Sequence, residues 1–389
     1  MSENRHDPID LKLMQRLPLE VKIRMTQDRI KAWYENWTRV DIVDDATGKT
    51  RHVTLDTRDR WAKLELKPSE WIEAEWPGAV YVSFSGGKDS TVLKHIVDSM
   101  YDDVPALFVN TGLEYPEIQK FAMSQKNVVT VRPEMRFDEV IKKYGFPVVS
   151  KEVANTVRGA KYSGGSGKWK TTRMQKLRGE LLDNDGNKSA YNCEKWAFLL
   201  DAPFDVSEQC CAVMKKKPAK QYEKETGRKP IIGTLANESR YRQQQWVRNG
   251  CNSFEGVRAR SAPLSFWTEQ DILHYLKKYN VPYCSVYGDI RIKPHGEDED
   301  QIDLIDYLGC YEPEDTLITT GCKRTGCIFC MFGCHLEKEP NRFQRLKETH
   351  PRQYNYCING GEMVDGKWQP SKEGLGLGKV LDYIGVDYE

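Results

Sequence analysis

The sequence has no apolar run of the roughly 20 residues that a membrane-spanning helix needs. Its first residues, Met-Ser-Glu-Asn-Arg-His-Asp, also lack the apolar region of a secretory signal peptide. The net charge is also small, since 58 basic side chains stand against 57 acidic ones. Overall charge therefore does not favour nucleic acid as a partner. These absences predict a cytoplasmic protein that spans no membrane.

A chain of 389 residues is long enough for more than one domain. Apolar side chains recur at helical spacing over residues 17–37, and a turn sequence separates two short strands at 40–43 and 52–55. A second short helix is expected around Trp71. Residues 1–76 are therefore predicted to form an N-terminal appendage of helix and hairpin.

The pattern changes after Pro77. Helical stretches alternate with apolar strands, which are expected at residues 79–84, 105–109, 127–132 and 230–234. This alternation predicts an α/β fold, a Rossmann-like, doubly wound, mostly parallel sheet with helices on both faces. We expect a nucleotide-binding domain over 77–284 with a polar, basic insert at 159–200, and a cysteine-rich C-terminal region, 285–389, packed on it.

Residues 82–90 read Val-Ser-Phe-Ser-Gly-Gly-Lys-Asp-Ser, a strand followed by a glycine turn and a helix start. Gly86 and Gly87 allow a sharp turn that brings backbone N–H groups close to an anion, and the helix N-terminus adds a favourable dipole. Lys88 can offset phosphate charge. The spacing is not that of a Walker A motif, which needs four residues between its first glycine and the Gly-Lys pair. The segment therefore predicts a phosphate site of another kind.

The sequence Ser-Gly-Gly-Lys-Asp-Ser resembles the PP-loop of the ATP pyrophosphatase superfamily, which binds ATP or a sulfonucleotide and acts at the α-phosphate. Further motifs resemble the phosphoadenosine phosphosulfate (PAPS) reductase family of this superfamily, in the same chain order. They lie at residues 110–117, 143–147, 233–242 and 263–272. One departure is Asn110, where the family more usually has aspartate. The resemblance covers roughly residues 79–334 and implies the PP-loop, or HUP, type of fold.

The resemblance assigns roles to individual residues. Those expected to bind the nucleotide are Ser83, Ser85, Gly86, Gly87, Lys88, Asp89, Ser90, Asn110, Thr111, Gly112, Glu114, Gly233, Glu238 and Ser239. Those expected to act in catalysis are Lys88, Asp89, Arg240 and Arg242, with Asp89 helping to place Mg²⁺ or capping the helix.

Eleven cysteines in an intracellular chain favour metal ligands or reactive thiols over disulfides. In the cluster-bearing branch of the family, a Cys-Cys pair and a later Cys-x-x-Cys bind [4Fe–4S], which here implies Cys210, Cys211, Cys327 and Cys330. A second set, Cys322, Cys327, Cys330 and Cys334, is compact enough to hold a cluster or Zn²⁺. Both remain open. Lys215, Lys216 and Lys217 would offset the charge of such a centre or bind substrate phosphate or sulfate.

A basic run at residues 161–178 contains six lysines and arginines and no acidic residue. It is either a solvated surface or a contact for a nucleic-acid partner.

Reductases of the family that act on adenylyl sulfate end in a Glu-Cys-Gly-Leu-His segment, which is absent here; the last cysteine is Cys357. The leading hypothesis is therefore cleavage of ATP to AMP and pyrophosphate, or adenylation, in support of sulfur transfer or nucleic-acid modification, as in the related DNA-phosphorothioation pyrophosphatases. The alternatives are reduction of APS or PAPS to sulfite, with Cys357 as the attacking thiol, and a non-catalytic nucleotide-binding subunit. A ParB-like or sulfur-donor protein would be the partner.

Overall fold

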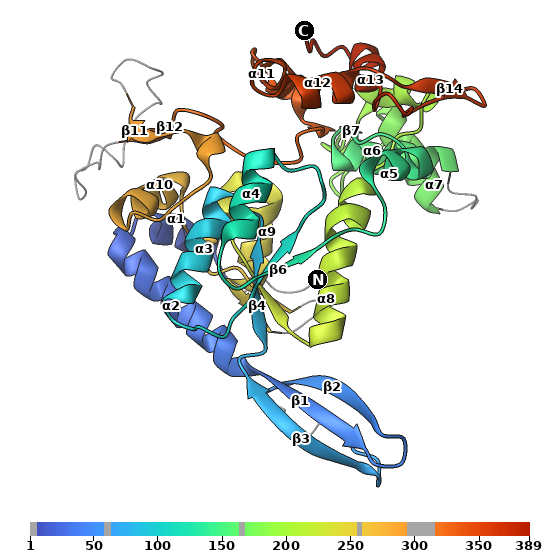
Figure 1. Ribbon diagram of the computed structural model, residues 1–389. Coiled ribbons are helices and arrows are strands. Elements are labelled where there is room, and N and C mark those ends of the chain that lie inside the picture. Colours follow the sequence, from blue (N-terminus) through green and yellow to red (C-terminus); the bar gives the residue numbers. More distant parts are fainter. Residues whose placement is uncertain (1–5, 58–63, 163–167, 255–258, 294–315) are drawn as a thin grey trace. The chain divides into compact units, whose positions relative to one another are not determined.

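The computed structural model describes residues 6–57, 64–162, 168–254, 259–293 and 316–389 (Figure 1). The chain forms two compact units. The sheet unit comprises Met1–Val109, Tyr115–Val131 and Ala219–Thr325, and the cysteine unit comprises Asn110–Glu114, Arg132–Pro218 and Gly326–Glu389. Each unit is assembled from stretches far apart in the sequence, so the units do not follow the three consecutive segments predicted above.

A six-stranded sheet of order β6-β5-β4-β8-β10-β9 forms the centre of the sheet unit. Its strands are β4 (Val80–Phe84), β5 (Ala106–Val109), β6 (Val128–Val131), β8 (Lys229–Ile232), β9 (Asn252–Ser253) and β10 (Arg260–Ser261). All neighbouring pairs are parallel except β9 with β10. The four predicted strands and the mostly parallel α/β fold are therefore confirmed.

Both faces of this sheet are covered, as the alternation of side chains along β4 shows. Val80, Val82 and Phe84 belong to the large core on one face. Tyr81 points to the other face, where it packs with Leu107 and with Tyr222 of α8 (Lys217–Thr226). Because successive side chains of a strand point to opposite faces, a strand buried on both sides is apolar almost throughout. This is the doubly wound arrangement that the sequence predicted.

The helices of the sheet unit begin with α1 (Pro8–Gln15) and α2 (Leu19–Asn36), the predicted N-terminal helix. They continue with α3 (Lys88–Asp98), α4 (Pro116–Ser124), α9 (Arg240–Asn249) and α10 (Glu269–Lys278), and the short turns Ala236–Glu238 and Ser285–Tyr287. Helix α10 begins with a capping box, since Thr268 Oγ1 accepts the N–H of Asp271, and Asp271 accepts the N–H of Thr268. Strands β11 (Ile290–Ile292) and β12 (Leu317–Thr319) pair antiparallel.

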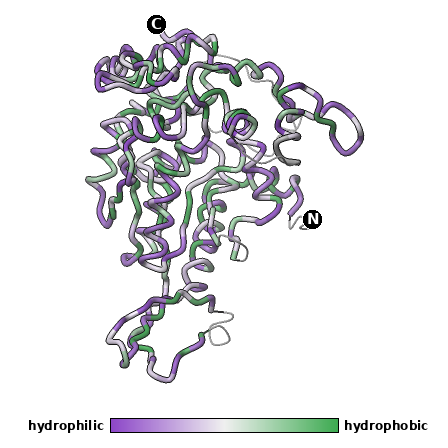
Figure 2. Tube along the Cα trace, turned by 90° about the vertical axis from the view of Figure 1, so that its right-hand side faces the viewer, coloured by the Kyte–Doolittle hydropathy of each residue, from purple (hydrophilic) through white to green (hydrophobic). Residues whose placement is uncertain are grey.

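The N-terminal appendage forms a separate antiparallel sheet of order β2-β1-β3. The predicted hairpin is present as β1 (Trp37–Asp44) and β2 (Lys49–Asp56). The helix expected around Trp71 is wrong, because this residue lies in β3 (Glu70–Pro77), where it pairs with Val43. Polar and apolar residues mix along all three strands (Figure 2), and pairing with β1 supplies the backbone partners that a helix would otherwise provide.

The cysteine unit is mainly helical. Its helices are α5 (Phe137–Tyr144), α6 (Lys151–Tyr162), α7 (Lys168–Arg178), α11 (Arg342–Thr349), α12 (Pro351–Ile358) and α13 (Leu377–Tyr383). Shorter turns are Glu194–Asp201, a π-helical turn at Ala212–Lys216, and Cys334–Leu336. Two small sheets pair β7 (Val148–Val149) with β13 (Met331–Phe332), and β14 (Glu362–Val364) with β15 (Lys367–Gln369).

Within the part of the chain that the structure describes, no helix is both long enough and apolar enough to span a bilayer.

Lys22→Ala is expected to lower the free energy of unfolding by about 3 kcal/mol or more, because the substitution leaves a poorly exposed carboxylate without its cation. Lys22 is 2% exposed and its ammonium joins Asp271, at 2.7 Å, and the carbonyl of Gln15, at 2.6 Å. The measurement is urea unfolding. Lys31→Ala on the same helix is the control, since its pair with Glu35 is solvent-exposed and should change stability by less than about 1 kcal/mol. Equal effects would contradict the prediction.

Candidate functional site

The predicted phosphate loop follows β4 and leads directly into α3, which begins at Lys88. Ser90 Oγ donates to the carbonyl of Gly87 at 2.9 Å and accepts the N–H of Ser85 at 3.2 Å, so the two serines fix the turn internally. No side chain hydrogen-bonds as the N-cap of α3. The Tyr287 hydroxyl accepts the Lys88 N–H, so it is the later N–H groups of the first turn and the positive dipole end that would face an anion.

Two glycines are needed for close packing around this loop. Gly86 has φ +72°, in the left-handed region, and a Cβ there would lie 3.0 Å from Ile118 Cγ2. Gly233, which follows β8, lies against the start of α3, where a Cβ would come within 3.2 Å of the Asp89 carbonyl oxygen and Ser90 Cα. Ser83 lies exposed in β4 rather than in the loop.

Lys88 is only 5% exposed and all its polar groups are engaged within the sheet unit. Its backbone N–H donates to the hydroxyl of Tyr287 at 3.2 Å. Its ammonium donates to the carbonyl of Lys323 at 2.9 Å and lies 3.0 Å from Glu269 Oε1. The charge of the loop lysine is therefore held in place by partners from two other segments.

Asp89 carries a buried carboxylate oxygen, Oδ1, that no described donor satisfies. Burial raises the pKa of this carboxyl above its ordinary range; the charge of Lys88 opposes the rise, and that of Glu269 adds to it. A carboxylate oxygen without a protein partner fits the oxygen-ligand preference of Mg²⁺.

Glu238 lies in the short turn before α9, and both its oxygens face arginine side chains. Arg242 contacts Oε2, and Arg324 Nη1 lies 3.7 Å from Oε1. Burial lowers the pKa of Arg242, and the nearby charge of Arg324 lowers it further. Ser239 Oγ caps α9 by accepting the N–H of Arg242. Arg240, also predicted as catalytic, is exposed.

Sequence reasoning missed the partners of Lys88 and Glu238 that come from elsewhere in the chain, namely Glu269, Tyr287, Lys323, Arg324 and Thr325. Tyr287 and Thr325 join their hydroxyls at 2.7 Å, and a Cβ on Gly87 would lie 3.2 Å from the Tyr287 hydroxyl oxygen. The available signal was the adjacent pair Lys323-Arg324 between two glycines, a basic turn suited to an anion.

Cys210 and Cys211 lie at the start of the helix that continues as the π-helical turn Ala212–Lys216. The preceding segment is fixed by Arg158 of α6, which pairs with both carboxylate oxygens of Glu208, and by Ser207 Oγ, which accepts the N–H of Gln209. The two sulfurs are 4.0 Å apart, well beyond the length of a disulfide bond. Single π-helical turns are frequent at functional sites.

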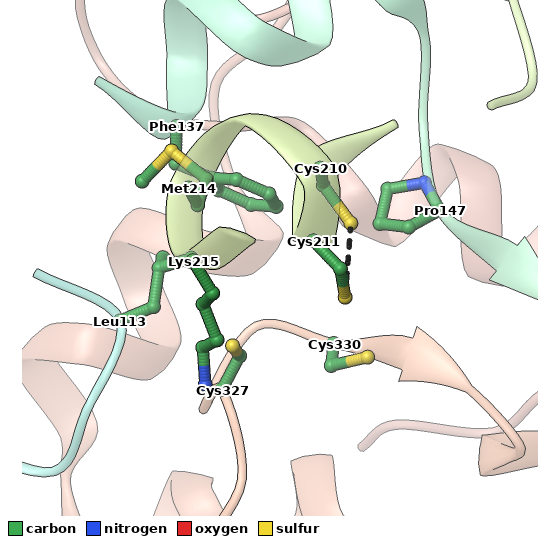
Figure 3. Close-up of a pocket in the computed structure, with 9 residues that line it drawn as sticks. All are labelled: Leu113, Phe137, Pro147, Cys210, Cys211, Met214, Lys215, Cys327 and Cys330. Atoms are coloured by element: carbon green, nitrogen blue, oxygen red, sulfur yellow. Dashed lines mark hydrogen bonds between the residues drawn. The ribbon is translucent and has the colours of Figure 1, made fainter. Parts of the chain in front are cut away.

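Cys327 and Cys330 lie in a tight turn in which the N–H of Cys330 donates to the carbonyl of Cys327 at 3.1 Å. Arg342 donates to the Cys330 carbonyl at 2.8 Å, and Ile328 N–H donates to the carbonyl of Leu113. Figure 3 shows the helix with Cys210 and Cys211 facing this turn. All four predicted cluster cysteines line one pocket of the cysteine unit; its other lining residues are Leu113, Phe137, Pro147, Met214 and Lys215.

As they stand, no three or more His, Cys, Asp or Glu side chains among the described residues are arranged to hold a metal ion. The two predicted cysteine sets nevertheless differ in where their side chains lie. Cys334 is buried and donates to the carbonyl of Met331 instead of lining the pocket, and Cys322 belongs to the sheet unit. The pocket thus gathers the first set and not the second.

The charges around the pocket favour thiolate at one position. The pKa of the Cys211 thiol is lowered because Cys210 donates a hydrogen bond to it, and Lys151 and Lys215 help to outweigh the effect of burial. Burial raises the pKa of Cys327 to about 11.

Lys215 and Glu114 connect the Asn110–Glu114 motif to this pocket. Glu114 is buried; it accepts the hydroxyl of Thr111 at 2.7 Å and lies 3.9 Å from the Lys215 ammonium. Burial alone would lower the pKa of Lys215, but the charges of Cys327 and Glu114 raise it. Lys217, by contrast, pairs with exposed Glu134. Asn110 accepts the N–H of Gly112 at 3.2 Å.

The predicted basic run lies partly outside the described residues. Of the part that is described, Lys176 pairs with Glu152 at 2.6 Å and Arg173 donates to Asn155 at 3.4 Å. These two side chains therefore hold α7 on α6.

The family model for the phosphoadenosine phosphosulfate reductase domain matches residues 79–179 and 176–331, well over half of the chain. The chain belongs to this family. A curated adenosine 5′-phosphosulfate reductase from Lysinibacillus sphaericus is 33% identical over 118 residues, which cover 30% of this chain and 49% of that protein. An uncharacterised protein from Methanocaldococcus jannaschii is 32% identical over 110 residues, 26% and 27% of the two chains. The chain thus matches less than half the length of either relative.

Among solved structures, the phosphate complex of PAPS reductase from Candida auris is similar at 15% identity, with a TM-score of 0.29, over 53% of this chain and 75% of that one.

Cys357 of α12, the thiol predicted for sulfonucleotide reduction, is 0% exposed, and burial raises its pKa well above its ordinary value. We expect the native protein to protect Cys357 from iodoacetamide, and labelling to appear once urea unfolds the chain, because thiolate and access are both required. Peptide mass spectrometry measures this, with partly exposed Cys193 as the internal control. Rapid labelling of Cys357 in the native state would contradict the prediction.

Proposed function

We propose that this protein binds an adenine nucleotide at the phosphate loop and cleaves it at the α-phosphate, releasing pyrophosphate and forming AMP or an adenylate. The observation that carries the proposal is the arrangement around α3, where an uncapped helix start, Lys88 and the unsatisfied Oδ1 of Asp89 occur together. The family match supports a nucleotide of the adenine class.

In this reaction an acceptor oxygen or sulfur attacks the α-phosphorus, the bond to the bridging oxygen breaks, and pyrophosphate leaves with the electron pair. The protein's task is to hold the phosphates and stabilise the leaving charge. Backbone N–H groups of the first turn of α3 after Lys88 would bind phosphate oxygens, and Lys88 and Arg242 would offset the charge. Mg²⁺, held by Asp89, would supply further charge neutralisation.

We further propose that Cys210, Cys211, Cys327 and Cys330 hold a [4Fe–4S] cluster. The support is their common pocket, whose other lining residues are apolar except for Lys215, because four thiolates in a dry shell suit such a cluster. The side chains would have to turn toward one point to bind it. Lys215, beside Cys327, would offset part of the negative charge of four thiolates.

Reduction of a sulfonucleotide to sulfite is the second candidate, favoured by the curated reductase among the relatives. Burial of Cys357 removes the thiol that the sequence offered for it. A reductase of this chain would need another thiol, on this protein or on a partner.

Purified protein incubated with ATP and Mg²⁺ is expected to release pyrophosphate, alone or with a sulfur-containing or nucleic-acid acceptor. Lys88→Ala should reduce the rate about 100-fold, since it removes a preorganised charge beside the phosphates. Lys120→Ala, on the exposed surface of α4, is the control and should match the wild type. Pyrophosphate is measured directly.

Other outcomes of the same incubations point elsewhere. Sulfite released from adenylyl sulfate, without pyrophosphate from ATP, would favour the reductase. Tight nucleotide binding without any product would indicate a non-catalytic subunit that acts with a partner.

Anaerobically purified protein is expected to contain about four iron and four sulfide per chain. Cys210→Ser and Cys327→Ser should lose this iron, whereas Cys322→Ser and the control Cys193→Ser should keep it. Iron, sulfide and zinc analysis measures the difference. Loss of metal in Cys322→Ser but not in Cys210→Ser would assign the centre to the second cysteine set, and zinc in place of iron would exclude the cluster.

A further inference from the structure

We propose that the segment Gly321–Thr325 is a second phosphate-binding loop of the nucleotide site, and that Arg324 is a specificity-determining side chain that binds the phosphate chain. The inference rests on the proposed nucleotide function and adds to it a segment outside the predicted motifs.

Hydrogen bonds join this segment to Lys88 of the phosphate loop, one directly and one through Tyr287. The Lys323 carbonyl accepts the ammonium of Lys88 at 2.9 Å. Thr325 Oγ1 lies 2.7 Å from the Tyr287 hydroxyl, which in turn accepts the backbone N–H of Lys88. Residue 324 therefore lies between Lys323, which contacts Lys88 directly, and Thr325, which is linked to Lys88 through Tyr287.

The Arg324 side chain is 62% exposed, yet its guanidinium is not remote from the site. Its charge acts on Asp89 and on Arg242, two residues at the proposed phosphate position.

Arg324 and Arg242 share a single carboxylate, that of Glu238. Asp89 is a second nearby carboxyl group, and its charge interacts with both arginines. The Arg324 contact with Glu238 is long, at 3.7 Å, and an exposed ion pair of this kind contributes little stability. The arginine can therefore leave Glu238 for a stronger anion at small cost.

A phosphate chain is such an anion, because its oxygens accept two parallel N–H bonds from the planar guanidinium. The ligand class is therefore a phosphoanhydride. Adenosine lacks the group that Arg324 would bind.

The test compares the binding of ATP, adenosine and inorganic pyrophosphate by isothermal titration calorimetry at one salt concentration. Arg324→Ala is expected to weaken the binding of ATP and pyrophosphate at least about tenfold, as loss of a charge-assisted hydrogen bond predicts, and to leave adenosine unchanged. Arg324→Lys should recover part of the loss. Arg248→Ala, an exposed arginine of α9, is the matched control and should behave as the wild type.

The outcomes separate the two proposals. Wild-type protein that binds pyrophosphate but no adenine nucleotide would reject the proposed function and leave the loop standing. Equal ATP and pyrophosphate affinities in wild type and Arg324→Ala would overturn the loop. So would an equal loss of adenosine binding, since that would indicate general damage to the site.

Discussion

The buried ammonium of Lys88 is the constraint on which the rest of the sheet unit's site depends. Burying a cation that is 5% exposed costs free energy unless its N–H groups have hydrogen-bond acceptors and its charge has an opposite charge nearby. The Lys323 carbonyl accepts a hydrogen bond from this ammonium and Glu269 supplies the opposite charge. The Tyr287 hydroxyl accepts the backbone N–H of Lys88. These partners fix α10, the Ser285–Tyr287 turn and the 321–325 segment around the start of α3, where phosphate would bind.

In the cysteine unit it is negative charge, on cysteine sulfur, that needs partners. A thiolate in this pocket needs positive charge or metal nearby, and Lys215 and Lys151 supply positive charge to Cys211. Arg342 reaches the same turn through the Cys330 carbonyl and is itself held by Glu337 at 2.8 Å. Arg324 and Cys327 are only three positions apart in the chain, so one continuous segment carries both the proposed phosphate contact and a proposed metal ligand.

Much of the central fold could be predicted because strands buried on two faces must be apolar almost throughout, as at Val80–Phe84. The helix expected at Trp71 was wrong. Residues 72–76 of this edge strand alternate apolar and acidic side chains, a period of two that indicates a strand, and pairing with β1 confirms it. The phosphate loop was predictable since its glycines, serines and helix start are neighbours in sequence.

The sequence by itself determined the parallel sheet, the glycine turn at the end of β4 and the cysteines that a metal centre would use, because each is a local pattern of residue types. Only the tertiary structure decided which partners hold Lys88, which arginines share Glu238, and which cysteines line one pocket. It also decided that Cys357 is sealed in the core. These are contacts between residues far apart in the chain, and no local pattern encodes which distant residue supplies the partner of a buried charge or thiol.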